Sequence, residues 1–245
     1  MHPLLKHVEH RTAPMPDGPW VMAQNWHDLL FAHWAMPAEK IRPLVPKDLT
    51  LDIYEEQAYV AVAPFWMSGV RPRFSPPLPG LSTFPEMNVR TYVSYKNIPG
   101  VYFFSLDAGS RLAVRAARWS YHLPYYFAEM SIKGLGPKFE YSSSRLDNPR
   151  PAEFRGRYWP TSSPRARGKD SLEHFMTERY CLYTTRNQKL YRAYIHHLPW
   201  ALQDAEAEIE VNTVAQAAGI ELPASKPLLH FARTLEVLIW LPQTV

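Results

Sequence analysis

The amino-acid sequence predicts a mainly β protein with a few short helices (α+β), in which many short strands close into a β-barrel. Of its 245 residues, 14 are Tyr, 11 are Phe and 8 are Trp, and these aromatic residues favour strands. The 24 prolines against 10 glycines indicate rigid, extended connections rather than flexible linkers. Short apolar runs recur between turn residues, and closing such strands into a barrel removes their exposed edges.

The predicted elements follow a leader that contains several prolines. Residues 1–20 are expected to be loose, and residues 21–245 to form a single domain, although the length alone suits either one large domain or two small ones. Trp26–Met36 is the first predicted strand, and Pro37 is expected to open a short helix, since proline fits the first helical turn. Later strands are predicted at Leu49–Tyr54, Ala58–Met67, Asn88–Tyr95, Val101–Leu106, Phe127–Lys133, Lys138–Arg145, Glu153–Tyr158, Arg179–Thr185, Leu190–His196, Glu206–Thr213 and Leu229–Trp240.

Local signals also predict one hairpin and two further helices. Leu49–Tyr54 and Ala58–Met67 are predicted to pair with each other as a hairpin. Ser110–Trp119 is predicted to be a helix capped by its first serine. A second helix is expected within SLEHFMTE, with Asp170 or Ser171 as its cap.

The charge balance is mildly basic, with a net charge of +4 and a pI of about 9.1. Part of the excess lies in Arg145–Lys169, which also carries several prolines. A nucleic-acid footprint requires a coherent basic face, whereas prolines favour loops. We therefore expect solvated loops here, rank nucleic-acid binding last, and leave the role of the segment open.

The cysteine count and the lack of long apolar runs indicate the cellular compartment. Cys181 is the single cysteine, so no intrachain disulfide can form, and its strand-like surroundings predict a packed, inert thiol. The N-terminal residues lack the apolar core of a signal peptide, and no apolar run approaches membrane-spanning length. The sequence therefore predicts a soluble, cytoplasmic protein without a membrane partner, and self-association is left open.

Polar residues alternate with apolar ones after Phe84. Since alternate residues of a strand share a face, Glu86, Asn88 and Arg90 are predicted to lie together, opposite Met87 and Val89. The polar face either lines a ligand cavity or meets water, and both interpretations stay open. On the first, Glu86 is a candidate catalytic residue, and Asn88 and Arg90 are candidate ligand-binding residues.

The helix Ser110–Trp119 carries a stripe of arginines. Arg111, Arg115 and Arg118 are spaced so that they share one side of the helix. A guanidinium can grip a carboxylate or phosphate with two parallel hydrogen bonds. We expect Arg111 to face solvent, Arg115 to contribute to ligand binding, and Arg118 to be functional because it lies nearest to the Pro124–Tyr126 segment.

Two tyrosines, Tyr125 and Tyr126, follow Pro124. Near an arginine the pKa of a phenol should fall, because the cation favours the phenolate. Either hydroxyl could then act as an acid or stabilise a developing oxyanion. The alternative is ordinary aromatic packing with the hydroxyl satisfied at the rim.

No metal or cofactor is expected. His196 and His197 are adjacent, so on a strand they point to opposite faces and cannot clamp one ion together. The other histidines lack the spacing of a zinc motif, and the sequence has no glycine-rich phosphate loop, nucleophile elbow or dinucleotide fingerprint.

A set of motifs resembles a known family. They are WHDLLFAHW, LVPKDLTLD, FPEMNVRTYV, GVYFFSLDA, AARWSYHLPYYFA, FMTERYCLYT and IHHLPW, in this order. Together they resemble the DUF2071 family of uncharacterised bacterial proteins, the YqjF-like proteins. The resemblance runs from about Trp26 to Trp240 and implies no function by itself.

DUF2071 proteins are in turn similar to the acetoacetate decarboxylase fold, a β-barrel with a deep central pocket. That resemblance places Glu86 at the family's glutamate and Arg118 at the arginine of its Arg-Glu pair, with Trp119 replacing the glutamate of the pair. Tyr125 and Tyr126 then occupy the positions of the two lysines. A phenol cannot form an imine, so the resemblance implies a retained pocket without Schiff-base chemistry.

Two functions follow as hypotheses. In the first, a barrel enzyme or binding protein takes a small organic acid or carbonyl compound. Arg118 holds the anionic end, Glu86 acts as a base or hydrogen-bonding partner, and Tyr125 and Tyr126 donate to an oxyanion. In the second, the protein is a non-catalytic ligand-binding or sensing module in which Glu86 and Arg118 form a structural ion pair.

Overall fold

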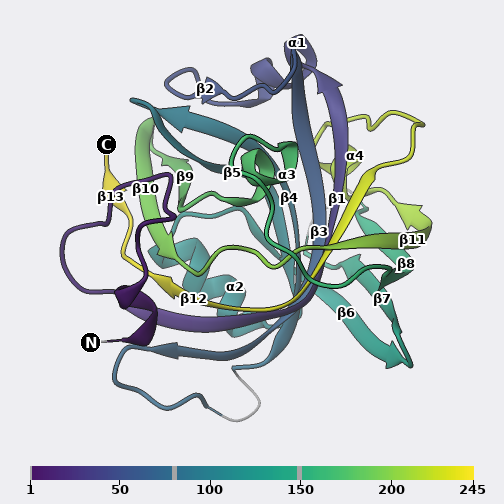
Figure 1. Cartoon of the computed structure of the whole chain (residues 1–245), viewed down its shortest axis with the longest axis horizontal. Coiled ribbons are helices and arrows are strands. Elements are labelled where there is room, and N and C mark those ends of the chain that lie inside the picture. The colour runs from purple at the N-terminus through teal and green to yellow at the C-terminus, as the bar shows by residue number, and fades with distance from the viewer. Residues whose placement is uncertain (1, 79–81, 148–150) are drawn as a thin grey trace.

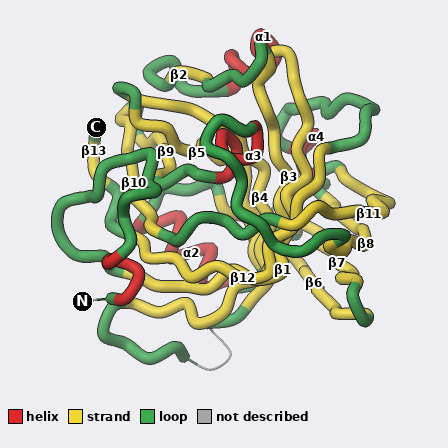
Figure 2. Tube along the Cα trace, viewed as in Figure 1, coloured by secondary structure: helices red, strands yellow, loops and turns green. Residues whose placement is uncertain are grey.

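The computed structural model describes residues 2–78, 82–147 and 151–245, and it is mainly β with a few short helices, as predicted (Figures 1 and 2). The strands are β1 (Met22–Pro37), β2 (Thr50–Leu51), β3 (Gln57–Pro72), β4 (Phe84–Tyr95), β5 (Ile98–Ala108), β6 (Tyr125–Leu135), β7 (Lys138–Arg145), β8 (Glu153–Pro160), β9 (Cys181–Arg186), β10 (Lys189–His196), β11 (Gln203–Asn212), β12 (Leu228–Ile239) and β13 (Gln243–Thr244). The helices are α1 (Ala38–Ile41), α2 (Arg111–Ser120), α3 (Leu172–Thr177) and α4 (Val214–Ala217), with short 3-10 turns at Pro3–Lys6 and Arg42–Leu44.

Seven of the strands are hydrogen-bonded in a cycle, in which the last strand pairs with the first. Successive hydrogen-bonded pairs lead from β12 through β1, β3, β4, β5, β9 and β10 and back to β12. A second route runs from β5 through β6, β7, β8 and β11 to β12. In Figure 1 strands β6, β7, β8 and β11 form a group on the right, beside the long curved pair β1 and β3.

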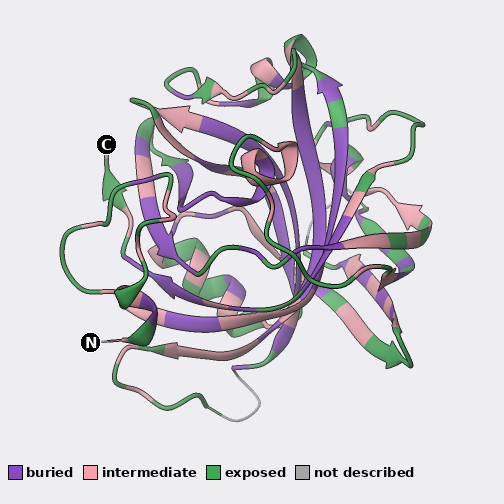
Figure 3. Cartoon of the chain, in the orientation of Figure 1, coloured by how far each residue is buried: buried purple, intermediate pink, exposed green. Residues whose placement is uncertain are grey.

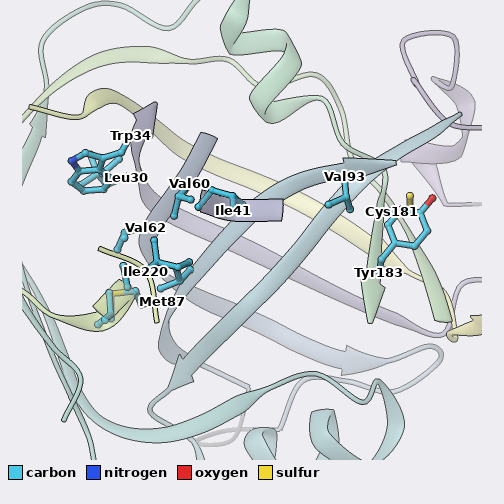
Figure 4. Close-up of a cluster of buried hydrophobic side chains, with 14 of the residues drawn as sticks. Leu30, Trp34, Ile41, Val60, Val62, Met87, Val93, Cys181, Tyr183 and Ile220 are labelled. Carbon is cyan, nitrogen blue, oxygen red and sulfur yellow. The ribbon is translucent and has the colours of Figure 1, made fainter. Parts of the chain in front are cut away.

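The predicted alternation along β4 is confirmed. Met87, Val89 and Val93 belong to one buried cluster, which Val60 and Val62 of β3 share. Figure 4 shows part of this cluster, and Figure 3 shows how continuously the long strands are buried. Glu86, Asn88 and Arg90 point to the opposite face of the sheet, where a second apolar cluster lies.

Two further local predictions are confirmed. Ser110 caps α2, because its hydroxyl accepts a hydrogen bond from the amide of Ala113. Cys181 is buried in the first cluster, and burial raises the pKa of its thiol to about 11, so it is a packed thiol rather than a reactive one.

Helix α2 connects two parallel neighbours, β5 and β6. Parallel strands need such a crossover because their ends lie at opposite edges of the sheet. The register sets Leu106 beside Tyr125 and Asp107 beside Tyr126. Consecutive strand residues face opposite sides, so the two adjacent tyrosines enter different environments.

The leader is not loose, contrary to the sequence prediction. Leu4 is buried, the Arg11 guanidinium donates to the Ile195 carbonyl over 2.8 Å, and the Thr12 hydroxyl donates to the Glu178 carbonyl over 2.7 Å. Polar side chains of the leader thus donate to carbonyl groups of the domain, which holds this part of the leader in place.

The predicted hairpin between Leu49–Tyr54 and Ala58–Met67 is confirmed only at its turn, where the backbones of Tyr54 and Gln57 exchange two hydrogen bonds, and the two segments do not pair beyond it. The short strand β2 pairs with β4, with Thr50 opposite Ser94. Strand β3 already has β1 on one side and β4 on the other, so it has no free edge for β2.

The basic segment Arg145–Lys169 contains strand β8, and acidic residues neutralise it. Its exposed ion pairs are Arg155–Glu210, Arg157–Glu140 and Arg165–Asp204. Arg145 departs from the predicted solvated surface, because it is buried against Asp107. Arg150, which also belongs to this segment, lies outside the described residues. None of the helices in the described ranges is long and apolar enough to cross a membrane.

Candidate functional site

A cavity of about 110 Å³ lies against the polar face of β4. Every strand of the cycle contributes to its wall, and α2 and the segment after it add Ala117, Tyr121 and Leu123. Apolar residues dominate the lining, and the two indoles Trp26 and Trp200 stack with centroids 5.9 Å apart. The polar groups of the lining include Glu86, Asn88, Arg90, Tyr121, Tyr125, Thr177, Arg179 and His197.

Arg90 is the most unusual of these polar groups. The residue is only 8% exposed, and its Nε has no hydrogen-bond partner. Across the described part of the chain, no carboxylate lies within 4.0 Å of its guanidinium. Its guanidinium lies close to the Tyr92 hydroxyl, a neutral group, and its guanidinium carbon is 5.1 Å from the centroid of the Phe31 ring. A buried cation without an anion is costly, so the site is electrostatically incomplete as it stands.

Glu86 lies on the same face of β4 as Arg90, but its side chain has a hydrogen-bond partner. Its residue is 4% exposed, and its Oε2 accepts a hydrogen bond of 2.7 Å from the Tyr125 hydroxyl. Burial raises the pKa of Glu86 to about 8, the Tyr125 hydrogen bond opposes this shift, and the charge of Asp107 adds to it. Glu86 is therefore mainly protonated at neutral pH.

Tyr125 differs from the prediction in its acidity. Burial of its hydroxyl, together with the neighbouring Glu86, raises the pKa of Tyr125 well above its ordinary value. The lowered phenol pKa that we predicted from a nearby arginine is wrong, because the hydroxyl contacts a carboxyl group and not a guanidinium. Tyr125 is thus a hydrogen-bond donor rather than a phenolate.

Further polar atoms of the lining lack partners. Trp26 Nε1, Asn88 Oδ1 and the Tyr121 hydroxyl are buried without a hydrogen bond. Buried polar groups in proteins are usually satisfied, so several orphans in one cavity indicate a place that a polar ligand or water fills.

Arg118 does not lie in this cavity. Its side chain is 44% exposed, its Nη2 lies 2.7 Å from Asp147, and its Nε donates to the Tyr125 carbonyl. The predicted ion pair between Glu86 and Arg118 is therefore wrong. On α2 the cavity is lined by Ala117, and the next residue of a helix points about 100° away from it.

Arg115 is also misplaced by the sequence prediction. It is exposed on α2, and the cavity lining does not include it. Arg111 faces solvent as expected, with its guanidinium carbon 4.0 Å from the Phe127 ring centroid.

Tyr126 faces the opposite side of the sheet from Tyr125. Its ring lies 4.1 Å from the guanidinium carbon of Arg145, which pairs with Asp107 through hydrogen bonds of 2.7 and 3.1 Å. Both partners are almost fully buried, with side chains 1% and 2% exposed. Sequence reasoning missed this pair, although alternation along Lys138–Arg145 puts Arg145 on the buried face of Phe139 and Tyr141.

Three other lining residues were also missed: Arg179, His197 and Trp200. Arg179 pairs with Asp52 and donates to the Phe175 carbonyl, so its charge is compensated, unlike that of Arg90. His197 is buried, and burial lowers its pKa to about 3, so its ring is neutral. Arg179 lies in the motif FMTERYCLYT, and His197 and Trp200 lie in IHHLPW, so the family motifs contained a signal for residues that reach the cavity from segments far from β4.

The cavity offers neither an amine nor a metal site. None of the residues that line it is a lysine. Across residues 2–78, 82–147 and 151–245, no group of three or more His, Cys, Asp or Glu residues is arranged to hold a metal ion.

Comparisons with known proteins agree with this architecture. The model of the DUF2071 family, described as an uncharacterised conserved protein, matches residues 23–236. The uncharacterised protein YqjF of Bacillus subtilis (strain 168) is 49% identical over 237 residues, which is 97% of this chain and 98% of YqjF.

Solved structures share the fold at low identity. Acetoacetate decarboxylase from Legionella pneumophila is 13% identical with a TM-score of 0.63, covering 95% of this chain and 91% of its own. The enduracididine biosynthesis enzyme MppR, complexed with the condensation product of pyruvate and imidazole 4-carboxaldehyde, is 9% identical with a TM-score of 0.62, covering 93% and 90%. These likenesses show an acetoacetate decarboxylase-like fold.

Proposed function

The chain belongs to the DUF2071 family, and we propose that it binds a small organic acid, or a carbonyl compound with an anionic end, in the cavity beside β4. In this proposal the cycle of strands is a closed barrel and the cavity is its central pocket. The contribution of every strand of the cycle to the lining supports this. The solved structure of MppR in complex with pyruvate shows that a protein of this fold can hold such a ligand.

One observation carries the proposal, namely the uncompensated guanidinium of Arg90. A carboxylate bound there would supply the missing charge and accept hydrogen bonds from the planar fork. Arg90 thus takes the role that the sequence assigned to Arg118, whose own charge Asp147 already balances.

The chemistry of the site does not include a Schiff base. An imine requires a primary amine, and the cavity presents phenols, a carboxyl group, amides and guanidinium groups instead. Of the two adjacent tyrosines, Tyr125 reaches the cavity, and it donates to Glu86. Glu86 and Tyr125 can therefore form hydrogen bonds or move protons, but they cannot form an imine with a carbonyl compound.

Titration calorimetry with hexanoate and benzoate tests the proposal. Wild type should bind at least one of these acids, and Arg90→Gln should weaken that binding by at least about tenfold, since a charge-assisted hydrogen bond is lost. Arg118→Ala is the matched control, because it removes an arginine outside the cavity, and its affinity should stay within about threefold of wild type. Equal affinities of wild type and Arg90→Gln would sink the proposal.

A second candidate function is acid–base catalysis on the bound carbonyl compound. The hydrogen-bonded pair of Glu86 and Tyr125 favours it, because a neutral carboxyl group can donate a proton to the carbonyl oxygen while water takes a proton from the adjacent carbon, which gives the enol and leaves Glu86 to regain its proton from solvent. Without such a step the protein is a non-catalytic binding or sensing module.

Hydrogen–deuterium exchange separates these two functions. A catalyst should speed deuterium uptake next to the carbonyl of an oxo acid in D2O, measured by NMR, and Glu86→Leu should abolish the acceleration. Uptake at the rate of the buffer alone, in a protein that still binds the acid, would leave the binding or sensing function.

A further inference from the structure

The inward row of β4 sets a length for the ligand. Among the residues of β4 that line the cavity, Glu86 and Arg90 are the outermost, and Asn88 lies between them (β4 is labelled in Figure 1). At about 3.3 Å per residue, these two residues lie about 13 Å apart along the strand. Side chains of a strand stand roughly perpendicular to the sheet, so the carboxyl and guanidinium groups keep much of this separation. This explains why they do not pair with each other.

The space between the two groups fits a short chain. Subtracting two hydrogen bonds of about 2.8 Å each leaves about 7 Å for the ligand itself. That corresponds to about five or six bonds between its two terminal oxygen atoms, at about 1.3 Å per bond along an extended chain. The cavity volume of about 110 Å³ agrees, since a protein cavity of about 150 Å³ holds benzene.

Arg90 and Glu86, at the two ends of this stretch of β4, can bind different chemical groups of a ligand. Arg90 requires an anion. At the other end Tyr125 occupies Oε2 of Glu86, which leaves Oε1 for the ligand. A protonated carboxyl group donates through that oxygen, so its natural partner is a neutral acceptor such as a carbonyl oxygen. A methyl group of the ligand beside Glu86 would leave the buried carboxyl donor unsatisfied. A second carboxylate of the ligand at this place would bring a charge into apolar surroundings.

We propose that the ligand is a short γ- or δ-oxo monocarboxylic acid, whose carboxylate binds Arg90 and whose ketone oxygen accepts a hydrogen bond from Glu86. This deepens the proposed function and rests on it. The apolar lining, including Leu29, Phe65 and Leu106, covers the methylene groups between the two ends. Asn88, with its unpartnered amide oxygen, lies beside the middle of the ligand.

A series of oxo acids tests the length and the far group together. The probes are 2-oxobutanoate, 4-oxopentanoate, 5-oxohexanoate and 7-oxooctanoate, each beside the unsubstituted acid of the same chain length, with 5-aminopentanoate as a cationic far end. Affinities are measured by calorimetry at pH 7. We expect 4-oxopentanoate or 5-oxohexanoate to bind about tenfold more tightly than its unsubstituted counterpart, as one buried hydrogen bond allows, and the shorter and longer oxo acids to lose this advantage.

Variants at Glu86 identify the group that provides the preference. Glu86→Gln keeps a neutral donor and should keep the preference for the oxo acid, whereas Glu86→Leu should remove it, so that each oxo acid and its unsubstituted counterpart bind with equal affinity. A preference that ignores chain length or survives in Glu86→Leu overturns the inference, and so does tighter binding of 5-aminopentanoate. If the acids bind through Arg90 without any preference, only this inference falls. If none of them binds, the proposed function falls with it.

Discussion

Strand β4 and helix α2 both carry arginines, and the structure uses them in opposite ways. On β4, Arg90 faces inward, is almost fully buried and has no acidic partner among the described residues. On α2, the arginine stripe faces outward, and Arg118 is half-exposed with its charge balanced by Asp147. The helix presents only Ala117 to the cavity.

The difference shows which arginine is evidence for a ligand. A row of like charges on a helix attracts attention in a sequence, but water and one surface carboxylate suffice to satisfy it. A guanidinium that is buried in an apolar cavity without a carboxylate beside it has no such help. The absence of a partner at Arg90 therefore says more about function than the number of arginines on α2.

The largest effect that we expect is on β4, where Glu86 should make the free energy of unfolding depend on pH. The folded protein holds the Glu86 proton up to about pH 8, whereas the unfolded chain loses it near the ordinary pKa of 4.5. Between these values the unfolded state binds fewer protons, so the free energy of unfolding falls as pH rises, by roughly 5 kcal/mol in total. Urea unfolding of wild type and Glu86→Gln at several pH values should give a difference that grows in this window. A constant difference would mean that Glu86 titrates normally.

The next effect concerns an arginine that is buried and paired. Arg145→Ala leaves Asp107 buried without its partner and should lower the free energy of unfolding by about 3–5 kcal/mol, because the desolvated charge is no longer compensated. Removing Arg90 instead leaves no stranded carboxylate, so Arg90→Met should cost far less or stabilise the ligand-free protein. Similar losses in both variants, measured by urea unfolding, would erase the distinction between these two arginines.

A smaller effect separates the two adjacent tyrosines. Tyr125→Phe removes a donor from buried Glu86 and should cost about 1–3 kcal/mol. Tyr126→Phe keeps the ring that packs on Arg145 and should change the free energy of unfolding by less than about 0.5 kcal/mol. Thermal and urea unfolding of the pair provide the comparison, and a larger loss in Tyr126→Phe would contradict their assigned environments.

The smallest effect is expected on the surface of α2. Arg118→Ala breaks a partly exposed ion pair and should cost about 0.2–1 kcal/mol, a loss that decreases further as salt screens the charges. Urea unfolding at low and high salt measures it. A loss above about 2 kcal/mol that salt does not reduce would show that this arginine supports the structure more than its exposure indicates.

Much of the fold could be predicted from local patterns. The alternation after Phe84, the serine cap of α2 and the apolar runs of the other strands depend on neighbours within a few residues. The structure confirms them, except that the strand predicted at Leu49–Tyr54 is reduced to Thr50–Leu51. The partner of β2 could not be predicted, because it depends on which sheet edges are free. The packed leader could not be predicted either, because its partners are carbonyl groups nearly two hundred residues away.

The site residues selected from the sequence also form two groups, those that reach the cavity and those that do not. Sequence reasoning selected Glu86, Asn88, Arg90 and Tyr125, which the structure brings to one cavity, and it also selected Arg115, Arg118 and Tyr126, which lie elsewhere. The first group follows from the strand period or from the resemblance. The second group failed because a residue's type and spacing do not reveal which side of an element faces the interior.

By itself the sequence determined the two faces of β4, since the pleat of a strand fixes where each residue points relative to its neighbours. Only the tertiary structure decided which arginine lacks an anion. Asp147 reaches Arg118, Asp107 reaches Arg145 and Asp52 reaches Arg179, each from a segment distant in the chain. A charge partner is a property of three-dimensional proximity, and for Arg90 the fold leaves that place empty within the described residues.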